Sequence, residues 1–404
     1  MNATSLDRDR LDRLVEFRHD LHRHPELGFE ERETARKVAA ELDALGVEYV
    51  DGLGGTGIVA WITGRGGDSD ASVGLRADMD ALPIEEKSGV EHASTQPGRM
   101  HACGHDGHTS MLLGAVESLK TNDDFAGTVY FVFQPAEEGV GGAKAMIEDG
   151  VFERFDVREI YALHNWPALP IGQYGLIAGP IMAGGDRVDI TIHGRGGHGG
   201  LNPHGCIDPI RIAAELVHKA HTIVSREVDP LRPAVLSICA MQGGDLNGFA
   251  VIPDAARLCG TIRALDDATR EVVRSGLRRL CASLEQYYDA TIELSIEDKF
   301  GVTYNDPGAT ETAREAIARC FGADTLAADY PPCMGGEDFS YMLAERPGAY
   351  IHVGSGDGEH SRGLHHPEYD FNDRIMADGI RLLAELAQDS LAKQASGDTE
   401  RRSA

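Results

Sequence analysis

The sequence has little positive charge. It carries 38 Lys and Arg residues against 65 Asp and Glu residues, which gives a formal net charge of −27 at pH 7. A chain this acidic repels the phosphate groups of nucleic acids and of anionic lipids. We therefore expect neither nucleic acid nor a membrane surface among the partners of this protein.

Long apolar runs and paired cysteines are also missing. No stretch reaches the roughly 18 consecutive apolar residues of a membrane-spanning helix, and the N-terminal segment lacks the apolar core of a signal peptide. The seven cysteines are odd in number and scattered, without a CxxC pair. This pattern favours reduced thiols over a disulfide framework. We expect a cytoplasmic protein.

Motifs of two common enzyme classes are absent or out of place. The sequence has no G-x-S-x-G turn of the kind that presents a serine nucleophile. Segments 52–57 and 194–199 fit G-x-G-x-x-G, but a dinucleotide site needs a strand before the glycines and a helix after them. The first segment instead precedes an apolar strand, and the second is followed by LNPHG. The sequence thus argues against a serine hydrolase and against a dinucleotide-dependent oxidoreductase.

Apolar patterning predicts an α/β fold with a mixed, mostly parallel sheet flanked by helices. After Pro180 the order becomes βαββαβ, typical of a small ferredoxin-like α+β domain, and the α/β pattern returns near residue 300. We expect a catalytic domain of residues 1–183 and 299–404, with residues 184–298 inserted. The predicted helices are 8–24, 30–45, 106–120, 142–149, 208–225, 267–288 and 373–394, and the predicted strands are 58–62, 72–75, 128–133, 159–163, 187–194, 234–241, 256–264, 291–296 and 348–354.

One segment concentrates potential metal ligands. MHACGHDGHT (100–109) contains three His, one Cys and one Asp just before a predicted helix. Thiolate and imidazole together suit zinc or another metal of the first transition row. Taken alone, the segment is also compatible with a histidine-rich loop that binds no metal.

Three more segments place potential ligands at or beyond the ends of apolar strands, where open α/β sheets bind their ligands. They are FQPAEEG (133–139), ALHNWP (162–167) and GLHHPEYDFND (363–373). Each alone has a simpler reading, as a charged turn or a structural histidine. Together, the four segments supply more ligands than a structural zinc site needs, which indicates two metal ions.

Over these segments and others the sequence resembles the dinuclear metallopeptidases that include aminoacylases, hippurate hydrolases, auxin-conjugate amidohydrolases and related carboxypeptidases. The similarity is greatest to the hippurate and indole-acetyl-amino-acid hydrolase branch, and it covers nearly the whole chain. The matching segments are HRHPELGFEE (22–31), LRADMDALPI (75–84), MHACGHDGHT (100–109), FQPAEEG (133–139), LHNWP (163–167), GRGGHGG (194–200), GGEDFSYML (335–343) and LHHPEYDFND (364–373).

The resemblance implies a metal-dependent amidohydrolase that cleaves N-acyl amino acids or related N-acylated small molecules. Glu137 would be the general base, and His198 would bind the substrate or its oxyanion. The implied cofactors are two divalent ions (Zn, Mn, Co or Ni), and the implied ligands are Cys103, His105, Glu138, His164 and His365. The alternatives are a metallo-carboxypeptidase or dipeptidase acting on short peptides, and a metal-binding protein with a decayed site.

The resemblance also implies a homodimer formed through the inserted lid domain, with His198 acting on the metals of the neighbouring subunit. The alternating strand 187–194 is a candidate for the exposed sheet edge that pairs with its two-fold mate. Such an edge would join the two subunits directly.

Two positions depart from the family pattern. Broader relatives carry His-x-Asp where this chain has Arg76-Ala-Asp78, and an arginine cannot bind metal because it stays protonated. At positions 250–253 the close branch usually reads Asn-Val-Ile-Pro, whereas this chain reads Ala-Val-Ile-Pro. Relatives use that Asn near the substrate, and Ala250 replaces it here. Arg263 is still available to clamp a substrate carboxylate, with a surface salt bridge as the plain alternative.

Overall fold

The computed structural model describes residues 7–403, with side chains described as far as Ser396. The chain forms two compact units. Unit 1 contains the residues up to Ile181, Thr303–Pro331 and the residues from Asp338 onward, and unit 2 contains Met182–Val302 and Pro332–Glu337. Within residues 7–403, no helix is both long enough and apolar enough to cross a membrane.

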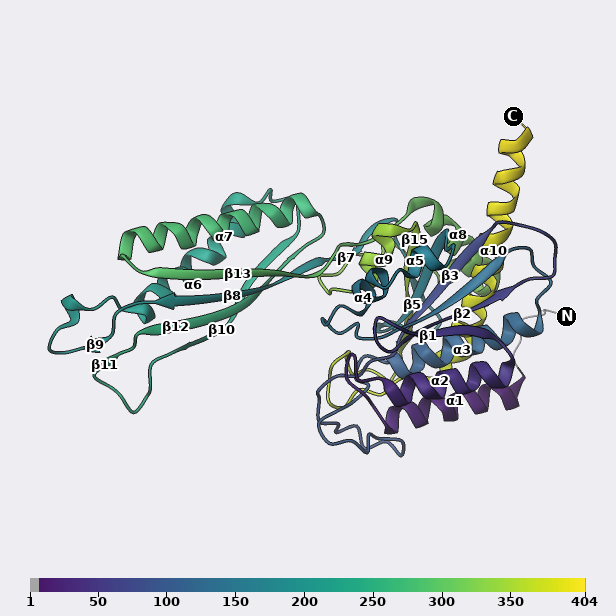
Figure 1. Ribbon diagram of the computed structural model, residues 1–404, viewed down its shortest axis with the longest axis horizontal. Helices are drawn as coiled ribbons and strands as arrows, with labels where there is room; N and C mark the ends of the chain where they lie inside the picture. Colours follow the sequence, from purple (N-terminus) through teal and green to yellow (C-terminus); the bar gives the residue numbers. More distant parts are fainter. Residues whose placement is uncertain (1–6, 404) are drawn as a thin grey trace. The chain divides into compact units, whose positions relative to one another are not determined.

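Unit 1 is built on a seven-stranded mixed sheet, seen in Figure 1. Its four central strands run parallel to one another because β4 pairs with β3, β3 with β5, and β5 with β15. Every residue of β3 is buried, as expected for a parallel strand covered on both faces. In sheet order the strands are β1 (Glu48–Leu53), β2 (Gly57–Thr63), β4 (Thr128–Gln134), β3 (Ser72–Asp78), β5 (Glu159–Pro170), β15 (Gly348–Gly356) and β6 (Tyr174–Gly175).

Helices pack closely on this sheet. The most buried is α3 (His105–Thr121), which contacts α1, α10 and β3 and exposes almost none of its first fifteen residues. Glycine permits this closeness, since a Cβ at Gly107 would lie 2.3 Å from the Phe371 ring. The other helices of unit 1 are α1 (Arg8–Arg23), α2 (Arg32–Leu45), α4 (Gly142–Glu148), α5 (Val151–Arg154), α8 (Pro307–Phe321), α9 (Phe339–Glu345) and α10 (Met376–Ser403), with 3-10 turns η2 (Ala323–Thr325) and η3 (Asp373–Ile375).

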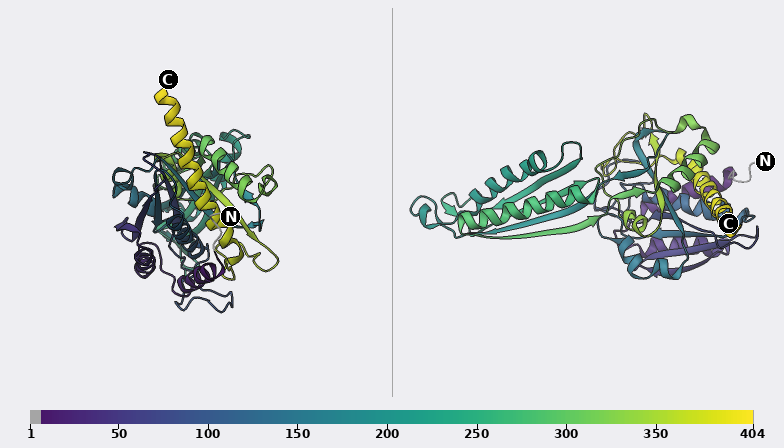
Figure 2. Two further views of the ribbon diagram at one scale, coloured as in Figure 1. Left: turned by 90° about the vertical axis from the view of Figure 1, so that its right-hand side faces the viewer. Right: turned by 90° about the horizontal axis from the view of Figure 1, so that it is seen from above.

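Unit 2 has the predicted βαββαβ order. Its sheet runs β10-β12-β8-β13 with every neighbouring pair antiparallel, which is a ferredoxin-like arrangement. Helices α6 and α7 lie side by side on the sheet in Figures 1 and 2. The elements are β8 (Gly184–His193), β9 (Gly197–His198), η1 (Pro203–Gly205), α6 (Pro209–Glu227), β10 (Ala234–Gly243), β11 (Val251–Ile252), β12 (Ala255–Ala264), α7 (Asp267–Tyr288) and β13 (Thr291–Phe300).

The prediction that 187–194 forms a sheet edge is wrong. This segment lies in β8, which is hydrogen-bonded to β12 on one side and to β13 on the other. Its apolar side chains pack into the core of unit 2 while the intervening residues are more exposed. Alternation of apolar and polar residues therefore indicates a sheet that is covered on one face only. It does not distinguish a central strand from an edge strand.

Six of the described strands were not predicted. They are β1, β6, the short pair β7 (Gly179–Met182) and β14 (Thr303–Asn305), and the short pair β9 and β11. Strand β1 has the sequence EYVDGL, in which charged residues and a glycine interrupt the apolar run. It is held in place by antiparallel pairing with β2, and its register shifts between Asp51 and Leu53. Pairing with a neighbour, which local sequence does not encode, decides such segments.

Candidate metal centre

The predicted ligands of unit 1 lie where the parallel strands end. Strand β4 ends at Gln134 and leads directly into the turn with Glu137 and Glu138, and β5 carries His164. Cys103 and His105 come from the loop and first turn of α3. The carboxyl ends of parallel strands form one edge of the sheet, so segments far apart in sequence meet there.

Two groups of ligand atoms form at this edge. Cys103, Glu138 and His365 offer ligand atoms within 4.8 Å of one another, and so do His105, Glu137 and Glu138. Glu138 belongs to both groups: its Oε1 lies 3.1 Å from His365 Nε2 and 3.9 Å from His105 Nε2. One carboxylate could therefore serve both groups of ligand atoms.

His164 completes the side nearest the thiol. Its Nε2 lies 3.4 Å from Cys103 Sγ, and its Nδ1 lies 2.7 Å from the carbonyl oxygen of Asn165. A Nδ1–H donated to that carbonyl would leave Nε2 available to a cation, which is the usual arrangement for a histidine ligand. All five ligands predicted from the sequence, together with Glu137, thus lie in one region of unit 1.

Asp80 orients two predicted ligands at once. Its Oδ1 lies 3.2 Å from His105 Nδ1, and its Oδ2 accepts the backbone N–H of Glu138 at 3.0 Å. A carboxylate on Nδ1 fixes the tautomer of a histidine and directs Nε2 toward a cation. The sequence contained this residue in the matching segment LRADMDALPI, but its role depends on contacts that only the fold creates.

The donor set fits divalent metal ions. Among the described residues, His105 Nε2 and Glu138 Oε1 are buried and have no hydrogen-bond partner, although Glu138 Oε1 is close to His365. Buried polar atoms without partners are costly, and a cation between them would remove that cost. Thiolate, imidazole and carboxylate together suit zinc and its neighbours in the first transition row.

The pKa shifts of Cys103 and His105 also indicate a site that favours a cation. Burial, followed by the negative charges of Glu138 and Glu137, raises the pKa of the Cys103 thiol well above its ordinary value. Burial lowers the pKa of His105, but Asp78 and Asp80 outweigh it and raise that pKa to about 10. Without a cation, the acidic centre therefore retains protons, and metal binding would release them.

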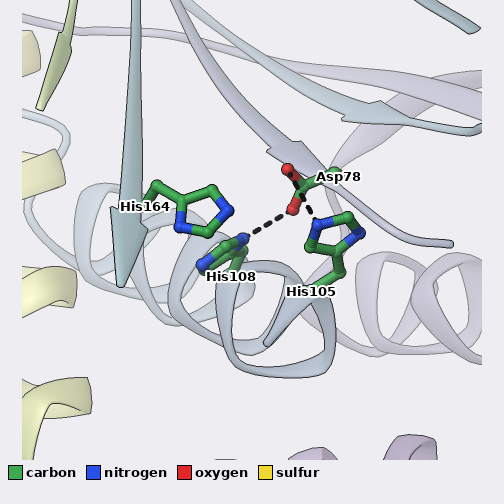
Figure 3. A group of neighbouring side chains, drawn as sticks. All are labelled: Asp78, His105, His108 and His164. Carbon is green, nitrogen blue, oxygen red and sulfur yellow. Dashed lines mark hydrogen bonds and ion pairs between the residues drawn. The ribbon is translucent and has the colours of Figure 1, made fainter. Parts of the chain in front are cut away.

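A second buried cluster, drawn in Figure 3, contains Asp78, His105, His108 and His164. His108 Nδ1 lies 2.6 Å from Asp78 Oδ1, and His108 Nε2 lies 2.6 Å from Asn165 Oδ1. Both ring nitrogens of His108 are therefore engaged by protein atoms. We interpret Asp78 and His108 as supports beneath the ligands, a role that the sequence did not indicate.

The turn that bears the glutamate pair is held by its surroundings. Ala136 has a positive φ of 52°, which is unusual for a residue with a side chain. Its backbone N–H is bound at 2.8 Å by Oε1 of the fully buried Glu31, whose Oε2 accepts the hydroxyl of Thr56 at 2.7 Å. The Glu137 carboxylate is buried, and its Oε1 accepts the backbone N–H of Asp338 at 3.2 Å.

His198 lies in unit 2 on the exposed two-residue strand β9, paired with Val251 of β11. Its Nδ1 is 3.1 Å from the backbone nitrogens of both Gly200 and Leu201, which donate to it. An Nδ1 that accepts hydrogen bonds is unprotonated, so the neutral ring carries its proton on Nε2. His198 therefore presents an N–H donor, the kind of group that stabilises an oxyanion.

Arg263, also in unit 2, forms no salt bridge with another residue that the structure describes. Its half-buried guanidinium lies 5.3 Å from the centre of the Phe300 ring, and Nη1 is buried without a hydrogen-bond partner among the described residues. A Cβ at Gly185 or Gly336 would lie 2.3 or 2.4 Å from Nη1, so the guanidinium occupies space that only glycine leaves open. Such a group is prepared to bind an anion.

Comparison with known proteins agrees with this chemistry. Residues 74–389 match peptidase family M20/M25/M40. The chain is 40% identical over 371 residues to hippurate hydrolase of Campylobacter jejuni (92% of this chain and 94% of that protein), and 40% identical over 349 residues to thermostable carboxypeptidase 2 of Saccharolobus solfataricus (85% and 86%).

Among solved structures, a Bacillus subtilis protein named as a dinuclear metal binding peptidase of the M20 family superposes with a TM-score of 0.81. It is 34% identical, and the match covers 96% of this chain and 99% of that one. The likeness therefore extends over both units and confirms the predicted α/β fold and its family. The chain belongs to peptidase family M20/M25/M40.

Proposed function

We propose that this protein is a metal-dependent amidohydrolase that cleaves the amide bond of N-acyl amino acids or related N-acylated small molecules. The observation that carries the proposal is the glutamate pair, in which Glu138 belongs to two ligand groups while the buried Glu137 lies beside it. The similarity to a hippurate hydrolase supports the substrate class. The proposed ligands of two divalent ions (Zn, Mn, Co or Ni) are Cys103, His105, Glu138, His164 and His365.

The protein groups divide the reaction among them. When bound, the two metal ions supply Lewis acidity and bring the pKa of a water ligand near neutrality. The Glu137 carboxylate takes a proton from the attacking water and then delivers it to the leaving amide nitrogen. The N–H of Asp338 on Glu137 Oε1 fixes the direction of this carboxylate. His198 Nε2–H donates to the developing oxyanion, and Arg263 binds the substrate carboxylate.

A substrate panel with metal control tests this proposal. The purified protein is assayed on N-acetyl and N-benzoyl amino acids before chelation, after chelation and after each of Zn, Mn, Co and Ni is restored. We expect hydrolysis that chelation abolishes and at least one metal restores. Full metal loading without hydrolysis of any N-acyl substrate would favour the non-enzymatic alternative.

A second candidate is a carboxypeptidase or dipeptidase, favoured by the similarity to thermostable carboxypeptidase 2. The same centre would serve it, because peptide and N-acyl bonds are both amides. Unblocked dipeptides and their N-acetylated counterparts, compared by kcat/KM in one assay, separate the two candidates. A preference for unblocked dipeptides would select the peptidase.

We also propose that the active form is a homodimer joined through unit 2. Strand β10 is an edge strand of the four-stranded sheet, and its second half is exposed. Met241 of this strand is exposed, and so are Leu246 and Phe249 of the loop that follows it. An exposed edge with apolar neighbours suits pairing with a second copy. In this assembly, His198 of one subunit would act at the metal centre of the other.

Mixed dimers test the shared site. His198→Ala and Glu137→Ala are each inactive in this scheme, and reassembly of equal amounts makes about half of the dimers mixed. Each mixed dimer contains one site with both Glu137 and a donated His198, so activity recovers to about a quarter of wild type. If His198 serves its own subunit, no site is complete and the mixture stays inactive.

We also propose that the enzyme is cytoplasmic, because its seven free cysteines would remain reduced in that compartment.

A further inference from the structure

The guanidinium of Arg76 lies completely buried next to the metal centre. It donates from Nε to Gln134 Oε1 at 2.8 Å, from Nη1 to Asp78 Oδ2 at 2.9 Å, and from Nη2 to Asp338 Oδ1 at 3.3 Å. These partners belong to three separate places in the chain: the ends of β3 and β4 and the residue before α9. One side chain therefore ties together three segments of unit 1.

Asp338 passes this constraint to the proposed base. Its Oδ1 also accepts from Gln134 Nε2 at 2.7 Å, and its Oδ2 accepts the N–H of Ala143 at 2.9 Å. With both carboxylate oxygens held, the Asp338 backbone is fixed, and its N–H lies 3.2 Å from Glu137 Oε1. The path from Arg76 to Glu137 thus contains one intermediate residue.

Gln134 supplies a second path. It ends β4 three residues before Glu137, and Arg76 and Asp338 both bind its side-chain amide. The intervening turn contains Ala136 at positive φ. A turn in an unfavourable backbone conformation keeps its shape only when its surroundings determine it, and the fixed end of β4 is one of those surroundings.

Charge explains why an arginine occupies this position. Asp78 and Asp338 are both fully buried, and Arg76 is within salt-bridge distance of each. A buried carboxylate needs a paired charge, and the planar fork of arginine can bind several acceptors in fixed directions, whereas lysine provides a single flexible ammonium group. The geometry therefore depends on the shape of the guanidinium as well as on its charge.

We propose that Arg76 is a positioning residue for Glu137, acting through Asp338 and Gln134. The inference rests on the proposed role of Glu137 as the general base. A base displaced by a fraction of an ångström still binds its neighbours but transfers protons poorly. Loss of the fork should therefore reduce turnover, while substrate binding and metal binding persist.

The main test is Arg76→Lys, which retains the positive charge and loses the fork. We expect kcat to fall about tenfold to a hundredfold, while KM stays within about twofold and metal content is unchanged. Arg346→Lys is the matched control, because Arg346 also donates three hydrogen bonds, to the carbonyls of Val157, Glu345 and Phe152, but contacts no residue of the centre. This control should retain wild-type kcat.

Asp338→Asn provides an independent variant if Arg76→Lys fails to fold. It retains the backbone N–H that reaches Glu137 and weakens the contacts that fix it. Asp338→Asn should show the same fall in kcat at constant KM, and the double variant should be no worse than the poorer single one, because both disturb the same contacts among Arg76, Asp338 and Gln134. Wild-type kcat in either single variant, a parallel rise in KM, loss of metal, or additive effects would each overturn the proposal.

Assaying Glu137→Gln beside these variants distinguishes failure of the proposed base from failure of the positioning role of Arg76. If Glu137→Gln turns over normally, the proposed function of Glu137 fails and Arg76 has no base to position. If Glu137→Gln is inactive while Arg76→Lys is as active as wild type, the base assignment holds and only the positioning role is lost.

Discussion

The two units present their functional groups in opposite ways. Around the centre in unit 1, carboxylates are held by two or more donors: Asp80 by His105 and the Glu138 N–H, and Asp338 by Arg76, Gln134 and Ala143. In unit 2, His198 is exposed and Arg263 has a buried nitrogen without a described partner.

This contrast separates groups that the protein orders in advance from groups that are left open toward the substrate. A group whose hydrogen bonds are already satisfied is preorganised, and it contributes to the transition state without first being ordered. A group with unused donors has its partner supplied by the substrate. Substitutions in unit 1 should therefore lower kcat, and substitution of Arg263 should raise KM.

The largest effect is expected for Glu137→Gln. The amide has nearly the shape of the carboxylate but cannot accept the proton of the attacking water, so kcat should fall at least about a hundredfold. Metal content should stay at the wild-type value because Glu138, rather than Glu137, is the proposed ligand. Metal stoichiometry and kcat measured on one sample test both statements. Normal turnover, or metal loss together with activity, would reverse the two glutamate assignments.

Arg263→Met tests whether Arg263 binds the carboxylate of the substrate. Methionine retains apolar contact with the Phe300 ring but removes the charge. A hydrogen bond between charged groups is worth about 1.5–3 kcal/mol, so KM for acyl amino acids should rise roughly tenfold to a hundredfold with kcat nearly unchanged. The matching α-amide substrates, which lack the carboxylate, serve as controls and should not respond. Equal losses on acids and amides would remove the clamp assignment.

A smaller effect is expected for Glu31, which binds the turn that bears the glutamate pair and should make stability depend on pH. Burial is the main cause that raises the pKa of Glu31 from 4.5 to about 7. Since the folded state then binds this proton more tightly than the unfolded state, the contribution of Glu31 to stability is greatest at low pH and declines as pH rises through about 7. Glu31→Gln removes the titration and retains an acceptor for the Ala136 N–H.

Thermal unfolding of the chelated protein between pH 5 and pH 8 measures this effect. Glu31→Gln should match wild type or unfold slightly earlier near pH 5, and should gain about 1 kcal/mol relative to wild type by pH 8, since one weakened hydrogen bond offsets part of the benefit. Glu33→Gln, at an exposed position of α2, should follow the wild-type pH dependence. A difference that does not vary with pH would show that Glu31 does not titrate in this range.

Sequence predicted the parts of this molecule that local patterns encode. Apolar runs predicted most of the strands, and the α/β class is confirmed by structures of the same family. The supports around the centre were missed because their contacts join distant segments; Arg76 and Asp338 are 262 positions apart. The central place of β8 was missed for a different reason. A strand covered on one face alternates in the same way at the centre and at the edge of a sheet.

The smallest effect is expected at Ala250, which stands where the resemblance to the hippurate hydrolase branch implies an Asn. Its carbonyl oxygen accepts the N–H of Gly199 at 2.8 Å, and the next residue, Val251, pairs with His198. Ala250 therefore lies beside the proposed oxyanion donor. An asparagine here would add a side-chain donor close to His198, and one such hydrogen bond is worth about 1 kcal/mol, or about fivefold in kcat/KM.

Ala250→Asn should therefore favour acyl amino acids with a free α-carboxylate over neutral N-acyl amines by about fivefold, with little change in stability at this partly exposed position. Ala250→Val is the matched control, because it adds volume without a donor and should not change the ratio. The measurement is kcat/KM across acids and neutral analogues for the three proteins. Equal ratios for Asn, Val and Ala would place position 250 outside the substrate pocket and leave Arg263 as the selective group of unit 2.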